Sequence, residues 1–326
     1  MKLQILIPQY KETEEIIKPL LDSIEIQQRV DLKNDVEVII VNDGTDIFLS
    51  DNFLNNYSYS IKYYINKEHK GVSATRNLCL EKATADYIMF CDADDMFYNS
   101  CGLWIIFREI EQGFDSLAST FIEEGFDSTL NTFFYIDHNN DSTFVHGKVY
   151  RRKFLEEKNI KWNNNLTIHE DLYFNYLSQT LADNAKYLPT SFYLWRYREN
   201  SVCRHDPKYH LRTYNNFLDT KNALIEEFLK RGRNLDAEAV LINMIYDAYF
   251  TMNMDDWLNQ ENKEFRIKTE LRFKNYWFKY KDLHDKISLE TKNKIIIDLK
   301  SSKFQQGLVL EKQTFESWIN QIENNM

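Results

Sequence analysis

The chain has few of the residues that mark small stapled or repetitive proteins: 4 Cys, 8 Gly and 4 Pro among 326 residues. Its cysteines form no C-x-x-C pair, and three of them fall within expected strands or helices, so we interpret them as reduced core thiols. Glycine and proline are too sparse to form a flexible linker between two halves. The sequence also lacks internal repeats, heptad arrays and low-complexity tracts, which excludes repeat and fibrous architectures.

An excess of positive charge and a long apolar run are also missing. The formal net charge is −10, from 50 acidic and 40 basic residues, which argues against binding to nucleic acid through bulk electrostatics. The first apolar stretch, Leu3 to Ile7, holds only about five apolar positions before a proline, too few for a signal peptide core or a spanning helix. Together with reduced cysteines, this predicts a soluble cytoplasmic protein without a transmembrane segment.

Apolar and aromatic residues, by contrast, are plentiful. Hydrophobic residues make up 43% and aromatics 15% of the chain, which is typical of a packed globular protein. Single cores seldom grow beyond about 250–300 residues, so a chain of this length is expected to have two parts. The character of the sequence changes near residue 206, and we therefore expect domains at 1–205 and 206–326.

Short β-rich runs alternate with helical patterns in the first part. The expected strands are Leu3 to Ile7, Val36 to Val41, Ile61 to Ile65 and Tyr87 to Phe90. Helical faces occur between them, at Ile16 to Ile24 and at Val72 to Lys82, and this alternation favours an α/β fold with a mostly parallel sheet. Pro19 disrupts the first helical pattern, so that helix is expected to begin only a residue or two before it.

Long helical periods replace the strands after residue 206. The expected helices are Tyr209 to Arg231, Ala237 to Met252, Glu264 to Leu283 and Thr314 to Asn324. The second part is therefore predicted to be a helical region with an acceptor-binding, oligomer-forming or packing role.

Polar residues follow three of the expected strands, at the sheet edge where α/β proteins bind ligands. Tyr10 offers an aromatic ring, Asp43 offers a carboxylate beside a glycine, and the stretch Asp92 to Asp95 (D-x-D-D) offers three carboxylates. Crowded carboxylates repel one another unless a cation shares the site. The arrangement suits a nucleotide whose phosphates are held by a divalent metal.

Each of these features also has an ordinary structural interpretation. Asn42-Asp43-Gly44 is a common turn after a strand, Tyr10 alone is unremarkable, and the D-x-D-D stretch could cap a helix beginning near Met96. It is their occurrence at three successive strand ends that favours a nucleotide site.

Residues 1 to about 205 resemble the catalytic domain of the inverting family 2 glycosyltransferases, which have the Rossmann-like GT-A fold. The matching segments, in order, are "ILIPQYKE", "VIIVNDGT", "HKGVSATRN", "YIMFCDADD", "HGKVYRRKFL" and "IHEDLYF". Lys11 stands where Asn is more common in the family. No comparable resemblance covers residues 206 to 326.

The resemblance implies a nucleotide-sugar donor, usually a UDP-sugar, held with Mn²⁺ or Mg²⁺. It makes Asp94 the expected direct metal ligand and places Asp92 at the ribose or a metal-bound water; hard oxygen ligands fit either ion. His205 is a further candidate ligand. The expected donor-binding residues are Pro8, Tyr10, Asp43, Arg76, Asp92, Ala93 and Arg198. For Arg76 an ion pair inside the domain is the structural alternative.

The family also implies a general base in "IHEDLYF". By this resemblance Asp171 removes the proton of the attacking hydroxyl, while Glu170 orients the acceptor or the loop. The reverse assignment stays open. Both acids also suit the first turn of a helix, because they complement its dipole.

Two other classes of function remain compatible with the residues. A metal-dependent nucleotidyl- or phosphotransferase would also need D-x-D carboxylates but no base at Asp171, and a non-catalytic carbohydrate- or partner-binding module would consume no donor. The acceptor is left open among a glycan, a glycopolymer, a protein and a modified nucleobase, and a homo-oligomer is compatible with the sequence.

Overall fold

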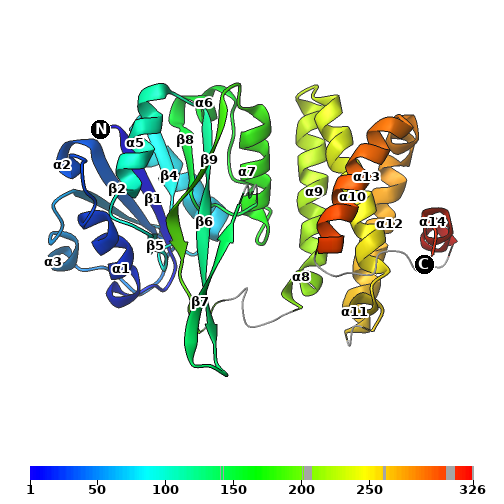
Figure 1. The fold of residues 1–326 in the computed structure, drawn as a ribbon, viewed down its shortest axis with the longest axis horizontal. Helices are drawn as coiled ribbons and strands as arrows, with labels where there is room; N and C mark the ends of the chain where they lie inside the picture. Colours follow the sequence, from blue (N-terminus) through cyan, green and yellow to red (C-terminus); the bar gives the residue numbers. More distant parts are fainter. Residues whose placement is uncertain are drawn as a thin grey trace. The chain divides into compact units, whose positions relative to one another are not determined.

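The computed structural model describes residues 1–139, 141, 143–199, 201, 208–259, 262–305 and 313–324. The chain divides into two compact units, Met1–Ser201 and Val202–Met326 (Figure 1). The first unit is built around one sheet, and the second is helical.

The sheet of the first unit contains nine strands in the part of the chain that the structure describes, ordered β3-β2-β1-β4-β8-β6-β9-β5, with β7 paired to β6. The strands are β1 (Leu3–Gln9), β2 (Val36–Asn42), β3 (Ser60–Ile65), β4 (Tyr87–Phe90), β5 (Met96–Phe97), β6 (Ser116–Asp127), β7 (Thr132–His138), β8 (Lys148–Arg151) and β9 (Ala185–Trp195). The four strands expected from sequence all form, and β1 and β2 each continue into the polar residues that follow.

Strand directions divide the sheet into two halves. β1 pairs in parallel with β2 and β4, and β2 pairs in parallel with β3, as the alternating pattern predicts. Beyond β4 the sheet is mixed, because β8 runs antiparallel to both β4 and β6, β7 runs antiparallel to β6, and β9 is parallel to β6. A mostly parallel sheet therefore describes the N-terminal half, whereas the whole sheet is mixed.

Helices cover both faces of this sheet (Figure 1). They are α1 (Glu14–Glu25), α2 (Leu32–Asp35), α3 (Asp51–Leu54), α4 (Val72–Lys82), α5 (Gly102–Gln112), α6 (Arg152–Glu157) and α7 (Glu170–Leu181). On one face, residues of α1 and α5 such as Leu20 and Leu103 share a buried core with Met89 of β4. On the other, Phe90 packs against Trp162, which stacks on Phe174 of α7 at 4.2 Å between ring centroids. Alternation along β4 thus sends Met89 and Phe90 into different cores.

The prediction for the start of α1 is wrong. The helix begins at Glu14, five residues before Pro19, and the proline lies inside it. Proline removes one helical hydrogen bond and crowds the carbonyl four residues earlier, which costs about 3 kcal/mol in a helix interior. Full burial of Ile17, Leu20 and Leu21 on both sides of the proline offsets this loss.

The residues after the D-x-D-D stretch also differ from one expectation. Met96 and Phe97 form the short strand β5, which pairs antiparallel with β9, and the next helix begins only at Gly102. The interpretation of this stretch as the cap of a helix near Met96 is therefore wrong. The carboxylates lie instead at a turn between two strands.

The second unit consists of helices in its described part. They are α8 (Tyr209–Arg212), α9 (Tyr214–Lys230), α10 (Asn234–Met252), α11 (Asp255–Leu258), α12 (Lys263–Lys286), α13 (Leu289–Gln305) and α14 (Phe315–Asn324). Their core is apolar and aromatic, with Phe250 and Trp257 fully buried, as expected for aromatic residues at helical spacing. α13 was not anticipated from the sequence.

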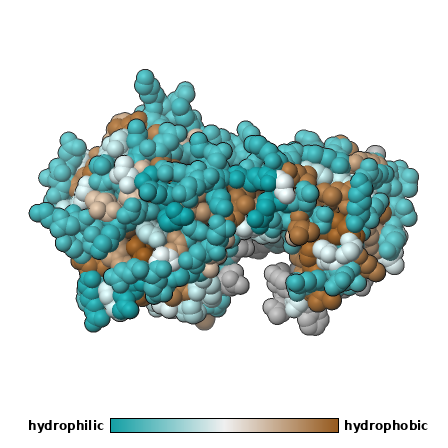
Figure 2. All heavy atoms as spheres, turned by 90° about the horizontal axis from the view of Figure 1, so that it is seen from above, coloured by the Kyte–Doolittle hydropathy of each residue, from teal (hydrophilic) through white to brown (hydrophobic). Residues whose placement is uncertain are grey.

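Hydrophilic side chains cover most of the face of the molecule seen in Figure 2, with apolar side chains gathered in smaller areas. Among the described residues, no helix combines the length and the apolar character needed to cross a membrane.

Candidate active site

The carboxyl ends of β1, β2 and β4 lie next to one another, because these strands are parallel neighbours. A hydrogen bond from the Asp43 backbone N–H to the Gln9 carbonyl, at 2.8 Å, continues the pairing of β1 and β2 past their ends. Pro8, half-buried, lies near the end of β1, and Ala93, buried, follows β4. The predicted donor residues that lie at the ends of these three strands therefore meet at one edge of the sheet.

Asp43 organises the loop between β3 and α4. Its carboxylate accepts hydrogen bonds from the backbone N–H groups of Lys70 and Gly71, both at 2.9 Å, and from the Asn66 amide at 3.1 Å. Its Oδ2 also lies 2.8 Å from Nδ1 of His69. Gly44, at φ +70°, allows this close approach, since a Cβ there would come within 2.2 Å of the Glu68 carbonyl carbon.

An aromatic pair lies at this edge of the sheet, with His69 on the loop between β3 and α4 and Tyr10 directly after β1. The Tyr10 ring is exposed and stacks on the ring of His69, with 4.3 Å between centroids. His69 is itself fixed by its contact with Asp43. A flat exposed ring beside a carboxylate that accepts several hydrogen bonds is an arrangement suited to a nucleobase.

Arg76 connects the D-x-D-D stretch with the E-D pair. Its guanidinium donates to Asp92 Oδ1 at 2.8 Å and to Glu170 Oε1 at 3.0 Å, and it lies over the Trp162 ring at 4.5 Å. Burial lowers the pKa of Arg76, but the carboxylates of Asp92 and Glu170 outweigh this and raise it above its usual value. The arginine thus makes the ion pair inside the domain that was weighed as its structural alternative.

Asp171 lies at the start of α7, beside this arginine cluster. The preceding His169 adopts a left-handed conformation, at φ +63°, which turns the chain into the helix. Burial, reinforced by the charge of Glu170, raises the pKa of the Asp171 carboxyl to about 8. Burial likewise raises the pKa of Glu170, although Arg76 opposes that shift. A carboxyl group with a pKa near neutrality suits general base catalysis.

Asp94 is paired with an arginine from the segment after β9. Arg198 Nη1 lies 2.8 Å from Asp94 Oδ2 and 3.8 Å from Glu12 Oε1. Burial raises the pKa of Glu12 to about 6. The sequence analysis did not single out Glu12; its position in "ILIPQYKE", just past the end of β1, was the only available signal.

Asp95 is the fully buried member of the D-x-D-D stretch. It accepts a hydrogen bond from the Tyr193 hydroxyl at 2.6 Å and another from the Arg196 backbone N–H at 3.0 Å. Burial, followed by the charges of Asp94 and Asp92, raises its pKa well above the usual value. His146 Nδ1 lies 3.5 Å from its Oδ2.

One group of described residues has the geometry to hold a metal ion. Asp92, Asp95 and His146 each offer a ligand atom, and these atoms lie within 4.8 Å of one another. Two carboxylate oxygens and one imidazole nitrogen fit Mn²⁺, and the oxygens also fit Mg²⁺. Asp94, the expected direct ligand, is adjacent but paired with Arg198. His205 lies outside the described residues.

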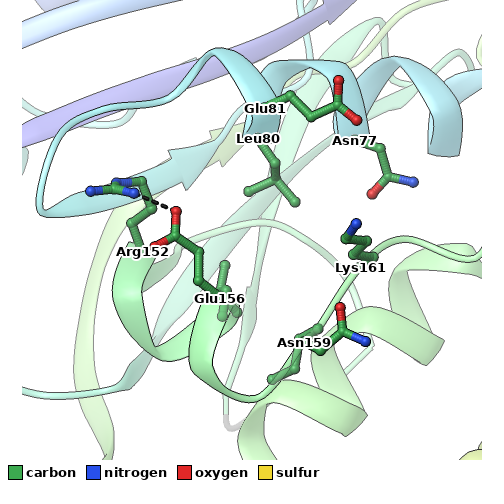
Figure 3. A pocket seen from close by; sticks show the side chains of 9 residues that line it. Asn77, Leu80, Glu81, Arg152, Glu156, Asn159 and Lys161 are labelled. Carbon is green, nitrogen blue, oxygen red and sulfur yellow. Dashed lines mark hydrogen bonds and ion pairs between the residues drawn. The ribbon is translucent and has the colours of Figure 1, made fainter.

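A separate hollow of about 340 Å³ lies between α4 and α6 (Figure 3). Its walls include Asn77, Leu80 and Arg152, and in Figure 3 Arg152 pairs with Glu156 on α6. None of the carboxylates described above lines it. The hollow is therefore distinct from the candidate active site.

Comparison with known proteins identifies the family of the chain. The sequence matches Glycosyl transferase family 2 over residues 4–175, so the chain belongs to that family. Residues 4–175 thus form a glycosyltransferase family 2 domain with a GT-A-like fold, and the resemblance to that family noted in the sequence is confirmed.

Named relatives resemble part of the chain, and a solved structure shares its fold. The chain is 26% identical to glycosyltransferase GlyA of Streptococcus pneumoniae over 62% of its length, and 26% identical to the uncharacterized glycosyltransferase EpsJ of Bacillus subtilis over 61%. The matched regions span about a third of GlyA (32%) and 62% of EpsJ. S. aureus TarS 1-349, solved in complex with UDP-GlcNAc, superposes with a TM-score of 0.63 at 17% identity, covering 96% of this chain and 97% of that one.

Proposed function

We propose that the protein is an inverting glycosyltransferase that moves a sugar from a UDP-sugar to an acceptor hydroxyl, with a divalent metal at the D-x-D-D stretch and Asp171 as general base. The observation that carries the proposal is the bridge made by Arg76. Contacts of 2.8 Å to Asp92 and 3.0 Å to Glu170 bring the carboxylates at the end of β4 beside the start of α7. A donor held at Asp92 would therefore present its sugar near Asp171.

The donor half of the site supplies binding and charge. Tyr10 and Asp43 form the expected nucleobase end, near Pro8 and Ala93, and the arginine that pairs with Asp94, Arg198, is a ready partner for the diphosphate. Asp92, Asp95 and His146 would hold the metal, with Asp94 beside them. Bound there, Mn²⁺ or Mg²⁺ supplies Lewis-acid stabilisation to the departing diphosphate. His205 remains a candidate ligand from the sequence.

The other half supplies the base. Asp171 takes the proton from the acceptor hydroxyl. The oxygen of that hydroxyl attacks the anomeric carbon at the same time, and the bond from this carbon to the diphosphate breaks on the opposite side. This displacement inverts the configuration at that carbon. Glu170, fixed by Arg76, holds a second negative charge beside the base and keeps the Asp171 pKa high.

The direct experiment is to incubate the protein with a panel of nucleotide sugars and Mn²⁺ and to follow release of the nucleotide from each donor. UDP-GlcNAc is the first donor to test, because TarS was solved with it. We expect slow, Mn²⁺-dependent hydrolysis of at least one UDP-sugar, and NMR should detect the β-anomer as the first product from an α-linked donor.

A control variant and the configuration of the released sugar complete this experiment. Asp86 is exposed and lies before β4, outside the site, so Asp86→Asn should hydrolyse the donor like the wild type. Release of the α-anomer first would contradict inversion. Absence of hydrolysis with every nucleotide sugar would contradict the proposed function.

A further inference from the structure

We propose that the acceptor is an uncharged saccharide that docks on an aromatic surface beside the donor site, formed by Phe133, Tyr135 and Tyr197. The inference rests on the proposed function and names the acceptor class for the same site. The three residues belong to β7 and to the segment after β9, both within the first unit.

The aromatic surface stands on the β6–β7 hairpin, which projects beyond the neighbouring strands (Figure 1). Phe133 and Tyr135 are 51% and 58% exposed, and as alternate residues of one strand they point to the same face. Phe126, directly opposite Phe133 on β6, packs against both Phe133 and Tyr197, with ring centroids 5.1 and 5.6 Å apart. These contacts hold exposed rings in fixed positions.

The carboxylate of Glu124 connects two of the three residues of the aromatic surface. Glu124, opposite Tyr135 in the hairpin, accepts a hydrogen bond from the Tyr135 hydroxyl at 3.2 Å and from the Tyr197 backbone N–H at 3.0 Å. Rings and an oxygen acceptor therefore lie side by side. Sugars offer the complement to this pair, since a pyranose has an apolar ring face and hydroxyl donors around its edge.

The surface is continuous with the candidate active site through the backbone of Tyr197. The preceding Arg196 donates its N–H to Asp95, and the following Arg198 pairs with Asp94 at 2.8 Å. A saccharide bound on the rings would therefore lie next to the D-x-D-D stretch. This continuity distinguishes the hairpin from an isolated apolar patch.

The negative charge of the β6–β7 hairpin favours an uncharged acceptor over an anionic one. Between Ser116 and His138 the sequence carries four acidic residues and no lysine or arginine; the acids are Glu123, Glu124, Asp127 and Asp137. The arginines that flank Tyr197, Arg196 and Arg198, both contact Asp94. The negative charge of the hairpin would therefore repel a phosphate-rich polymer, a nucleic acid, an anionic bilayer or a second copy of the hairpin. An uncharged saccharide meets no such repulsion.

The test is binding of the whole protein to a printed array of defined oligosaccharides, both uncharged and phosphate-bearing. We expect the wild type to bind one or more uncharged members, with little change between about 50 and about 500 mM salt, as befits contacts without net charge. Phe133→Ala and Tyr135→Ala should each weaken this binding about tenfold, a loss equivalent to about 1.4 kcal/mol.

The matched control is Ile136→Ala, on the same strand but on the opposite face and similarly exposed. It should bind within twofold of the wild type, and the far-UV circular dichroism of all three variants should match the wild type. An equal loss in Ile136→Ala, binding only to phosphate-bearing members, or no binding at all would overturn the inference.

Measuring donor hydrolysis distinguishes failure of the acceptor inference from failure of the proposed function. If the wild type hydrolyses a UDP-sugar but binds no uncharged saccharide, the acceptor inference fails and the proposed function stands. If it neither binds nor hydrolyses any nucleotide sugar, the proposed function itself fails.

Discussion

Asp171 has an environment unlike that of an ordinary surface acid. Burial and the neighbouring Glu170 charge raise its pKa to about 8, and Arg76 limits the shift. We expect Asp171→Asn to lower donor turnover about 10³-fold, because the amide cannot accept a proton, while UDP affinity stays within twofold. Steady-state UDP release and calorimetric UDP binding measure the two effects.

Glu170→Gln tests the reverse assignment of the base. It should reduce turnover less than Asp171→Asn does, because the amide oxygen can still accept from Arg76. A larger loss in Glu170→Gln than in Asp171→Asn would make Glu170 the base.

The same pKa predicts how stability depends on pH. Because the pKa of Asp171 is higher in the folded protein than in the unfolded chain, the folded state holds the proton more tightly. The stability contribution of this proton is complete below the unfolded pKa of about 4 and is lost as pH rises toward 8. Asp171→Asn removes this dependence.

The melting temperature of Asp171→Asn should therefore exceed that of the wild type by a margin that grows between pH 5 and pH 8. We expect about 1–2 kcal/mol at pH 8, or a few degrees. Differential scanning calorimetry across this pH range, with Asp86→Asn as control, checks it. A margin that stays constant or shrinks with pH would contradict the raised pKa.

At the scale of elements, the loop between β3 and α4 depends on one glycine. Gly44 combines φ +70° with a backbone contact that leaves no room for a Cβ, which would lie 2.2 Å from the Glu68 carbonyl carbon. Gly44→Ala should displace the loop that carries His69 and weaken UDP binding about tenfold or more. Calorimetric titration with UDP measures the loss.

Gly113→Ala is the matched control for that substitution. Gly113 also has a positive φ, of +75°, but a Cβ added there would have no atom of the described residues within 4 Å. The variant should lose some stability from backbone strain and keep its UDP affinity. Equal losses of UDP affinity in both variants would mean that strain alone, rather than the contact with Glu68, sets the effect.

Elements also differ in how well the sequence predicts them. β1, β2 and β4 were expected because their apolar runs are continuous, as in strands buried on both faces. β3 was expected because Ile61 to Ile65 is rich in aromatic and β-branched residues, although none of its residues is buried. β7 was missed: all but its last residue are exposed, so no burial pattern distinguishes it. The start of α1 was misplaced, because the local penalty of Pro19 gives way to burial of its flanking apolar residues.

At the scale of the whole molecule, donor binding should stabilise the fold. A ligand that binds only the folded state adds stability by mass action, about 2.7 kcal/mol at a hundredfold excess over its Kd. We expect UDP plus Mn²⁺ to raise the melting temperature by several degrees, and UDP with EDTA to raise it much less. Calorimetry of the full chain measures both, with ATP plus Mn²⁺ as the nucleotide control.

A shift that survives EDTA unchanged would contradict a metal at the D-x-D-D stretch. An equal shift with ATP would contradict recognition of the uridine base by Tyr10 and Asp43.

The sequence by itself determined the family, the parallel half of the sheet, and the strand ends that carry Tyr10, Asp43 and the D-x-D-D stretch. Those features depend on local patterns, in which a short continuous apolar run is followed directly by polar residues. Only the tertiary structure decided the partners of the acids. Arg76 joins Asp92 to Glu170, 94 positions away from the arginine, and His146 approaches Asp95 across 51 positions. Such distances arise from the packing of whole elements, and no local pattern in the sequence records them.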